Sequence, residues 1–148
     1  MKIKFFLSIL LFSNIGFSSY KLETVLDNLD DAWSFVFLSE DTILYTEMPG
    51  KLKIASLSDK SISEIDNVPE VQYASQGGLS EVALDPDFES NNTIYLSYSA
   101  KDENNKSTLF LSSAQLNGNT LENSKVIFQA KAPRRVPVHL AAKIGFLS

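Results

Sequence analysis

The sequence "TILYTE" (Thr42–Glu47) returns later in the chain, with small changes, as "TIYLSYS" (Thr93–Ser99). An acidic turn precedes both copies, and before each turn lies a strand-like run in which Phe37 and Leu84 take the same place, 47 residues apart. A repeat of roughly this length, with four strands in each unit, is typical of the blades of a β-propeller. A β-sandwich of about eight strands has the same alternation of residues and remains the alternative on periodicity alone.

Eight short runs rich in β-branched and aromatic residues predict an all-β protein. The first four runs cover residues 33–38, 42–47, 51–57 and 61–65, and the second four cover residues 78–84, 93–99, 108–116 and 125–130. Turn-forming residues separate the runs, most clearly "PG" at 49–50 and "NG" at 117–118. The sequence therefore predicts two four-stranded blades.

The last residues, "KIGFLS" (143–148), match "FVFLS" (35–39), with Phe146 at the place of Phe37. This match predicts the first strand of a third blade, so the expected fold is a β-propeller fragment of two blades and one further strand. Because blades bury their faces against neighbouring blades, such a fragment leaves two apolar faces open. We expect either a longer chain that continues the propeller or a partner that completes it.

The first 19 residues have the layout of a secretory signal peptide. A basic start is followed by an apolar run, Ile3–Phe12. The small residues Gly16 and Ser18 then come before the expected cleavage site. The apolar run is shorter than the roughly 20 residues that a membrane-spanning helix needs. We therefore expect residues 1–19 to be removed, residues 20–148 to form the N-terminal part of a propeller domain, and the protein to be periplasmic or secreted.

The amino-acid composition restricts the kinds of molecule that this protein is expected to bind. The chain has no cysteine and hence no disulfides, and its formal net charge is −5. An acidic chain without a basic stripe does not suit nucleic acid or an anionic membrane surface, so we predict neither as a partner. A neutral or cationic small molecule remains compatible with this charge.

The sequence predicts no metal site within this chain. Asp85, Asp87 and Glu89 alternate as at the start of a calcium loop, but Ser90 and Leu96 stand where an EF-hand needs glycine and glutamate. A single histidine and no cysteine leave only carboxylates as ligands for zinc, which is an unusual ligand set for that metal. The acidic stretch is explained as a tight turn between two strands.

Two polar residues occupy matching loops. Gln76 lies a few residues before the first strand of the second blade, in "SQGGLSE" (75–81), and His139 lies a few residues before the strand of the third. Equivalent loops of adjacent blades lie at one end of a propeller, so we expect the two side chains to converge there. The amide of Gln76 offers donors and an acceptor, and an imidazole suits removal of a proton from an alcohol. From position alone, a surface or core role for His139 remains open.

Four stretches occur in an order that resembles a known family: "LDDAWSFVFLSEDTILYTEMPGKLKI", "IDNVPEVQYASQGGLSEVALDPDFESNNTIYLSYS", "LENSKVIFQA" and "PVHLAAKIGFLS". They are similar to the soluble PQQ-dependent aldose sugar dehydrogenases, the glucose/sorbosone dehydrogenase family. The resemblance runs from about Leu26 to Ser148 and implies a six-bladed propeller that oxidises the anomeric hydroxyl of aldoses to lactones. It also implies the cofactor PQQ with calcium, and an aldose as the substrate.

The resemblance assigns roles to the same two residues. It implies that His139 takes the proton from the anomeric hydroxyl while hydride passes to the quinone, and that Gln76 lines the cofactor pocket. The chain departs from the family after the histidine, where an aromatic residue, two glycines and an arginine are usual and "LAAK" (140–143) stands instead. The family's later blades hold the quinone carboxylates and the calcium ion, and this sequence contains none of those ligands.

We therefore expect little or no activity from this chain alone. The alternative interpretation is a secreted, non-catalytic propeller fragment that binds carbohydrate or protein. A third interpretation, a propeller hydrolase that uses a divalent metal, is disfavoured because the carboxylate and histidine ligands it needs are missing.

Overall fold

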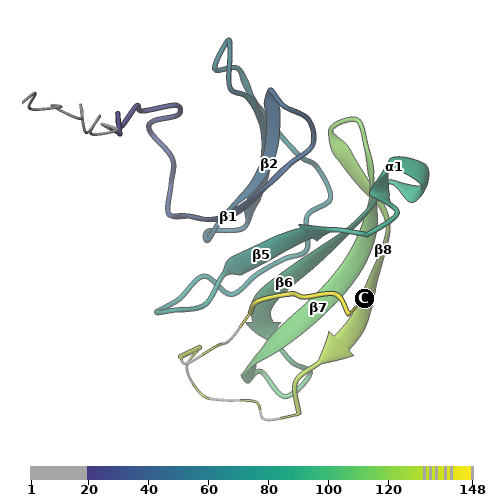
Figure 1. The fold of residues 1–148 in the computed structure, drawn as a ribbon. Helices are drawn as coiled ribbons and strands as arrows, with labels where there is room; N and C mark the ends of the chain where they lie inside the picture. The colour runs from purple at the N-terminus through teal and green to yellow at the C-terminus, as the bar shows by residue number, and fades with distance from the viewer. Residues whose placement is uncertain are drawn as a thin grey trace, which may run out of the picture.

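The computed structural model describes residues 20–131, 133, 135, 137–138, 140 and 142–147, and in these residues the chain forms two four-stranded antiparallel sheets (Figure 1). The first sheet contains β1 (Ala32–Phe37), β2 (Thr42–Glu47), β3 (Lys51–Ser56) and β4 (Ile62–Glu64). The second contains β5 (Leu79–Leu84), β6 (Thr93–Lys101), β7 (Ser107–Asn117) and β8 (Thr120–Gln129). In both sheets the strand order follows the sequence, as in successive propeller blades. The predicted all-β fold with two four-stranded units is confirmed.

Short turns join most of the strands. The "NG" pair closes the β7–β8 hairpin, where Asn117 faces Thr120 and Gly118 has a φ of 57° that suits glycine. The acidic turn after β5 contains a single helical turn, α1 (Phe88–Asn91). In this turn the Asp85 side chain accepts hydrogen bonds from the Asn91 amide and the Tyr95 hydroxyl.

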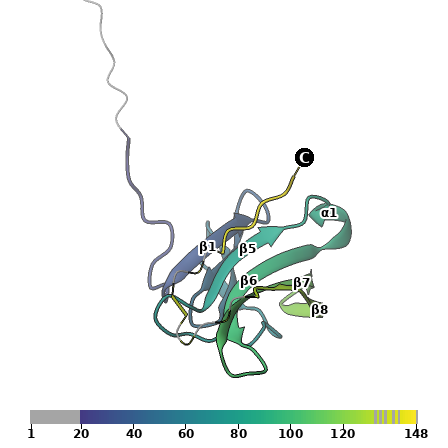
Figure 2. The same ribbon diagram turned by 90° about the horizontal axis from the view of Figure 1, so that it is seen from below.

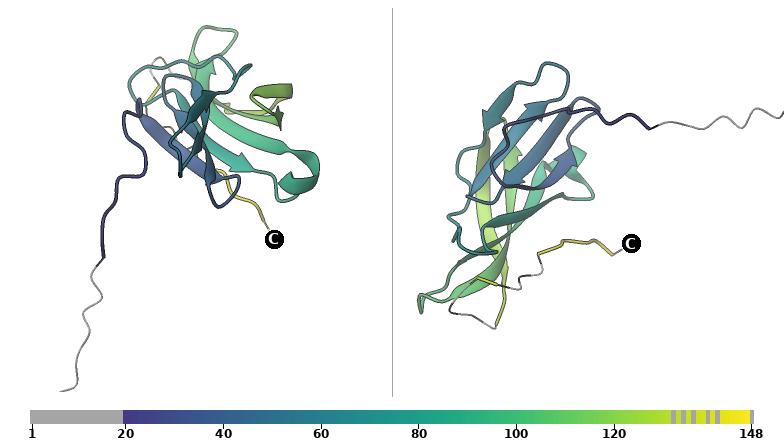
Figure 3. Two further views of the ribbon diagram at one scale, coloured as in Figure 1. Left: turned by 90° about the horizontal axis from the view of Figure 1, so that it is seen from above. Right: turned by 90° about the vertical axis from the view of Figure 1, so that its left-hand side faces the viewer.

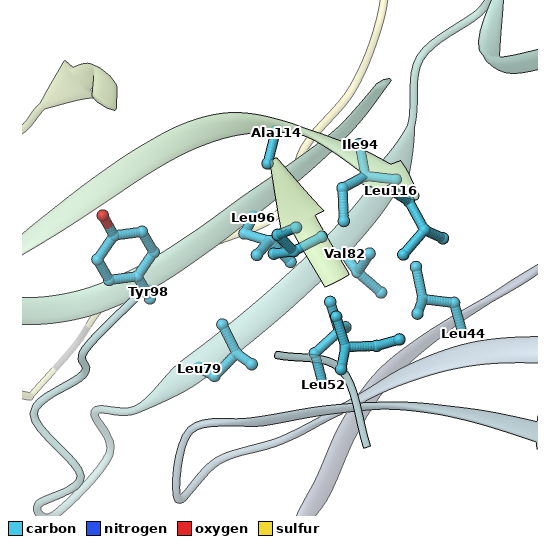
Figure 4. Close-up of a cluster of buried hydrophobic side chains, with 11 residues drawn as sticks. Leu44, Leu52, Leu79, Val82, Ile94, Leu96, Tyr98, Ala114 and Leu116 are labelled. Atoms are coloured by element: carbon cyan, nitrogen blue, oxygen red, sulfur yellow. The ribbon is translucent and has the colours of Figure 1, made fainter. Parts of the chain in front are cut away.

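The apolar core lies between the two sheets (Figure 4). Leu44 and Leu52 from the first sheet meet Val82, Ile94 and Leu96 from the second, and all five side chains are fully buried. Alternate residues of each strand point to one face of a sheet, so this core uses every second residue of β2 and β6. Burying one such side chain stabilises the fold by roughly 1.5–3 kcal/mol. The two sheets therefore hold each other in place.

In each sheet, a hydroxyl on the second strand links that sheet to the segment that follows it in the sequence. In the first sheet the Thr46 hydroxyl accepts a hydrogen bond from the Ser34 N–H at 3.1 Å and donates to the Ser80 carbonyl at 2.6 Å. A bulge in β1 lies at Ser34, so the hydroxyl satisfies an N–H that the regular ladder leaves out.

The second sheet repeats this arrangement with the C-terminal residues. The Ser97 hydroxyl accepts from the Glu81 N–H at 3.1 Å and donates to the Ala142 carbonyl at 2.6 Å. The ring of Phe146 also packs on Tyr95, with 5.5 Å between ring centroids. Residues 142–146 therefore lie against the second sheet as β5 lies against the first, and the C-terminal stretch runs beside β5 and β6 in Figure 2.

Residues 142–147 differ from the expected strand in one respect, because they form no ladder with any described strand. The first strand of each sheet pairs only with the strand that follows it, as β1 does with β2 and β5 with β6. Residues 142–146 thus occupy the position of a third-blade strand without forming the backbone ladder of a strand.

At the other end of the chain, residues 20–31 lead into β1 from outside the sheets (Figure 3). Tyr20 and Leu22 are almost entirely exposed, whereas Leu26 packs on Ile43 and Tyr45 of β2. The expected signal peptide, residues 1–19, lies outside the described residues and stays a prediction. The described part of the chain has no helix long and apolar enough to cross a membrane.

Candidate functional site

The loop that carries Gln76 meets the chain that follows β8 at one end of the sheets. The Gln76 N–H donates a hydrogen bond to the Pro137 carbonyl at 3.2 Å, and the Gln76 side chain is exposed. The described residues bring the Gln76 loop into contact with Pro137, two residues before the histidine, and the convergence of the two side chains stays a prediction. His139 itself lies outside the described residues, so its role stays a prediction.

Glycines make this contact possible. A Cβ on Gly77 would lie 2.4 Å from the Ser99 hydroxyl and 2.5 Å from the Pro137 ring, and both distances are too short for real atoms. A Cβ on Gly78 would lie 2.2 Å from the Met48 carbonyl oxygen. In the structure their neighbours are parts of the chain itself, so they are needed for packing between the loops.

A second pair of contacts holds the chain after the histidine. The Lys143 ammonium pairs with the Glu81 carboxylate, and the Ala142 carbonyl accepts from Ser97. Glu81 is buried, whereas the Lys143 side chain is largely exposed. A buried carboxylate needs a charged or hydrogen-bonding partner, and Lys143 supplies it. The stretch that contains His139 is therefore held on both sides, at Pro137 and at Ala142–Lys143.

Polar groups line the loop before Gln76. The Gln72 N–H donates to the Ser99 carbonyl at 2.7 Å, and its side-chain oxygen accepts from the Ser107 hydroxyl. On the same loop the Tyr73 hydroxyl donates to the Asp31 carboxylate, which raises the pKa of Tyr73 above its usual value. These bonds fix the loop from Gln72 to Gly78 against both sheets.

A groove of about 350 Å³ opens beside this loop, and sequence reasoning did not foresee it. It is lined by Glu70, Val71, Gln72, Ala100 and Lys101. Its lining includes one acidic side chain, Glu70, and one basic side chain, Lys101. No motif in the sequence indicates the groove, because its two walls are 30 residues apart along the chain.

The described residues do not form a complete site for PQQ. The three carboxylates of this quinone call for several cationic partners, and of the lysines beside the loop Lys143 is already paired with Glu81. Gln76 can contribute one amide to a polar ligand. In the described part of the chain no three His, Cys, Asp or Glu side chains come together as candidate metal ligands.

Comparison with known sequences gives a family match. The sequence profile of the family described as Glucose / Sorbosone dehydrogenase matches residues 29–148. The aldose sugar dehydrogenase YliI of Escherichia coli is 32% identical over 90 residues, which cover 60% of this chain and 24% of YliI. The uncharacterized protein slr1608 of Synechocystis is 30% identical over 135 residues, which cover 86% of this chain and 32% of that protein.

Comparison with solved structures agrees with this family match. A glucose dehydrogenase crystal structure is 36% identical with a TM-score of 0.71, and the match covers 76% of this chain and 33% of that one. The apo form of the soluble aldose sugar dehydrogenase of E. coli is 29% identical with a TM-score of 0.71, covering 75% and 33%. The PQQ-bound form of an aldose sugar dehydrogenase from Streptomyces coelicolor, 22% identical with a TM-score of 0.60, shares the fold.

These neighbours confirm the interpretation of the two sheets as part of a propeller rather than as a sandwich. The chain spans 24–33% of the length of the two curated relatives and of the glucose dehydrogenase structure.

Proposed function

Because the chain belongs to the glucose/sorbosone dehydrogenase family, we propose that it is part of an oxidoreductase that converts the anomeric hydroxyl of an aldose to a lactone. The match over residues 29–148 carries this proposal. The contact between the Gln76 loop and Pro137 supports it, because it brings the two sequence-predicted loops to one place.

Within this reaction we assign the proton transfer to His139 and the orientation of a ligand to Gln76. An imidazole has a pKa near the working pH, so it can take a proton from a hydroxyl group and release it afterwards. Gln76 lies on the loop that contacts Pro137, and its exposed amide can donate to and accept from a polar ligand. The hydride acceptor of this class of enzyme is PQQ, and Gln76 is the described residue that we expect to line its pocket.

A chimera tests this assignment. Residues 66–143 would replace the matching segment of the E. coli aldose sugar dehydrogenase, which supplies the rest of the propeller. We expect aldose-dependent dye reduction in the presence of PQQ and calcium, and a loss of about 10²–10⁴-fold on His139→Ala. The change Lys131→Ala, outside both anchored points, serves as the control. An active chimera that tolerates His139→Ala would remove the histidine from the mechanism.

The unmodified chain gives a second test. With PQQ and calcium added, we expect no aldose-dependent turnover, because the described residues do not supply the cations that the quinone needs. Robust turnover would contradict this expectation.

Export is part of the same proposal. An aldose dehydrogenase of this kind would act outside the cytoplasm, and the first 19 residues have the layout of a signal peptide. Fractionation of cells and sequencing of the N-terminus should find a periplasmic or secreted chain that begins near Tyr20.

A further inference from the structure

The second sheet contains a buried charge at a place where the first sheet has a hydroxyl. Glu81 takes the place of Ser34, 47 residues earlier, and both lie in the irregular part of the first strand of their sheet. The Ser34 hydroxyl accepts a weak hydrogen bond from the Val82 N–H at 3.5 Å, whereas the Glu81 carboxylate pairs with the Lys143 ammonium. At the same position, each sheet thus contacts the segment that follows it, once through a hydroxyl and once through an ion pair.

The charge is not required for packing one sheet on the next. Within the described residues the two sheets meet through apolar side chains and hydroxyls, and no ion pair joins them. The Glu81 side chain is only 11% exposed. Taking a carboxylate out of water is costly, and a buried ion pair is often no more stabilising than apolar side chains of the same size. A buried ion pair can instead select one arrangement of two segments, because each charge must lie beside its partner.

The segment that this ion pair holds is the chain after the histidine. The Ser97 hydroxyl donates to the Ala142 carbonyl at 2.6 Å, and the next residue, Lys143, pairs with Glu81. One hydrogen bond fixes a single point of a chain, whereas contacts at two neighbouring residues also fix its direction. The ion pair therefore adds direction to a point that Ser97 already holds.

The position of His139 is restricted by the chain on both sides of it, although the residue itself lies outside the described residues. Successive Cα atoms are about 3.8 Å apart, so the Cα of His139 lies within about 8 Å of that of Pro137. The Pro137 carbonyl accepts from the Gln76 N–H at 3.2 Å. Because only residues 140 and 141 separate the histidine from Ala142, the direction of the chain there affects where the imidazole can reach.

We propose that Glu81 and Lys143 form a positioning pair for the proton acceptor. By fixing the direction of the chain at residues 142–143, the pair sets the place of the His139 imidazole relative to Gln76. This inference rests on the proposed function, which assigns the proton transfer to His139. A displacement of about 1 Å can lower a catalysed rate by about 10²-fold, so a pair that acts only through the histidine still affects the reaction.

Proton NMR of the purified full chain tests the positioning directly. His139 is the only histidine, so its imidazole Hε1 proton gives one identifiable signal. At about pH 8, where an imidazole is neutral, we expect this signal to differ in chemical shift from that of the urea-unfolded chain. Lys143→Met should move it toward the unfolded value. Lys143→Arg should keep it, because the side chain is 84% exposed and has room for the larger cation. The control is Lys125→Met, on the exposed part of β8.

A double variant separates positioning from stability. Lys143→Met leaves the buried Glu81 carboxylate without its partner, so it should lower the melting temperature measured by circular dichroism. Adding Glu81→Met removes that charge, and the melting temperature should rise again. The His139 signal should stay displaced, because residue 143 is still not linked to β5. Recovery of both the melting temperature and the signal would show that the pair contributes stability alone, and would overturn the proposal. An unfolded-like His139 signal in the unchanged chain, or an unmoved one in Lys143→Met, would also overturn it.

The chimera with residues 66–143 connects the pair to the reaction. We expect Lys143→Met to lower kcat by about 10–10²-fold with little change in KM for the aldose, and Lys143→Arg to retain most of the activity. A chimera that is inactive, or that tolerates His139→Ala, contradicts the proposed function, and the NMR signal still decides whether the pair positions the histidine. A chimera that loses activity on His139→Ala but not on Lys143→Met leaves the proposed function in place and overturns the positioning pair.

Discussion

At the scale of single residues, the hydroxyls of Thr46 and Ser97 form the same pair of hydrogen bonds in the two sheets. Each joins an N–H at a bulge to a carbonyl of the next strand in the sequence. A side chain that serves as both acceptor and donor is required at this place, because both backbone groups are away from water. Serine and threonine are the residues that combine these two functions in a small volume.

Replacing Thr46 by valine should therefore lower the stability of the fold. The change keeps the shape of the side chain but leaves the Ser34 N–H and the Ser80 carbonyl without their partner, at a cost of about 1–3 kcal/mol. Urea unfolding followed by circular dichroism measures the difference, and Thr46→Ser should recover most of it. Thr42→Val is the control, because the Thr42 side chain makes no hydrogen bond to the described residues. Equal stability of Thr46→Val and the unchanged chain would contradict this role.

Gly77 gives a second prediction at this scale. An alanine there would place its methyl carbon 2.4 Å from the Ser99 hydroxyl, so the loop must move away from Pro137. We expect a lower melting temperature for Gly77→Ala and faster cleavage by trypsin after Lys131 or Arg135. Gly145→Ala is the control, because nothing lies within 4 Å of the added carbon. Identical cleavage rates for the two variants would show that the contact with Pro137 does not hold this loop.

At the scale of elements, the connection from β5 to β6 is held by one carboxylate. The Asp85 side chain accepts from the Asn91 amide at 2.9 Å, from the Asp87 N–H at 2.9 Å and from the Tyr95 hydroxyl at 2.8 Å. These donors, the Asn91 amide first, lower the pKa of the Asp85 carboxyl below its ordinary value of 3.8. The Asp85 carboxylate is thus a hydrogen-bonded brace for α1 and β6.

This brace predicts how stability depends on pH. Since the pKa of Asp85 is lower in the folded state, its contribution is present above pH 3.8 and is lost as the pH falls through the folded value. We expect Asp85→Asn to be less stable at neutral pH and to lose less stability than the unchanged chain on acidification below pH 3.8. Thermal melts between pH 2.5 and 6 measure this, with the exposed Glu89→Gln as the control. A parallel pH profile for Asp85→Asn and the unchanged chain would exclude the brace.

At the scale of the whole molecule, the core shared by the two sheets makes them one unit. Leu44 and Leu52 pack directly on Val82 and Leu96, so neither sheet buries its face without the other. Unfolding of one sheet therefore removes the core of the other. We expect a single cooperative transition in which both sheets unfold together.

Leu96→Ala tests this coupling. The change removes a fully buried side chain of β6, and we expect a loss of about 2–5 kcal/mol. Trp33 lies in β1 of the other sheet, so its fluorescence reports the first sheet only. The fluorescence transition should shift to lower urea by the same amount as the circular dichroism transition. The exposed change Val126→Ala serves as the control, and a fluorescence transition that Leu96→Ala leaves in place would mean that the sheets unfold separately.

Much of this molecule follows from local residue patterns, and some of it does not. The positions of the strands were predicted closely because β-branched and aromatic residues cluster in them. An exception is the start of β8 at Thr120, five residues before the predicted run, because Thr120–Ser124 is mostly polar and its strand state depends on pairing with β7. The groove at Gln72 and Lys101 had no local signal, since it forms between a loop and the end of β6.

The sequence by itself determined the all-β class, the repeat of two units and the family, because alternation and turn residues act over a few positions along the chain. It also pointed to Gln76 and His139 through their matching places in the repeat. Only the tertiary structure decided that Gly77 packs on Pro137, that Ser97 holds Ala142, and that the face of β1 stays open. The physical reason is that these contacts join residues 22 to 60 positions apart, and their energies depend on distances that no local pattern contains.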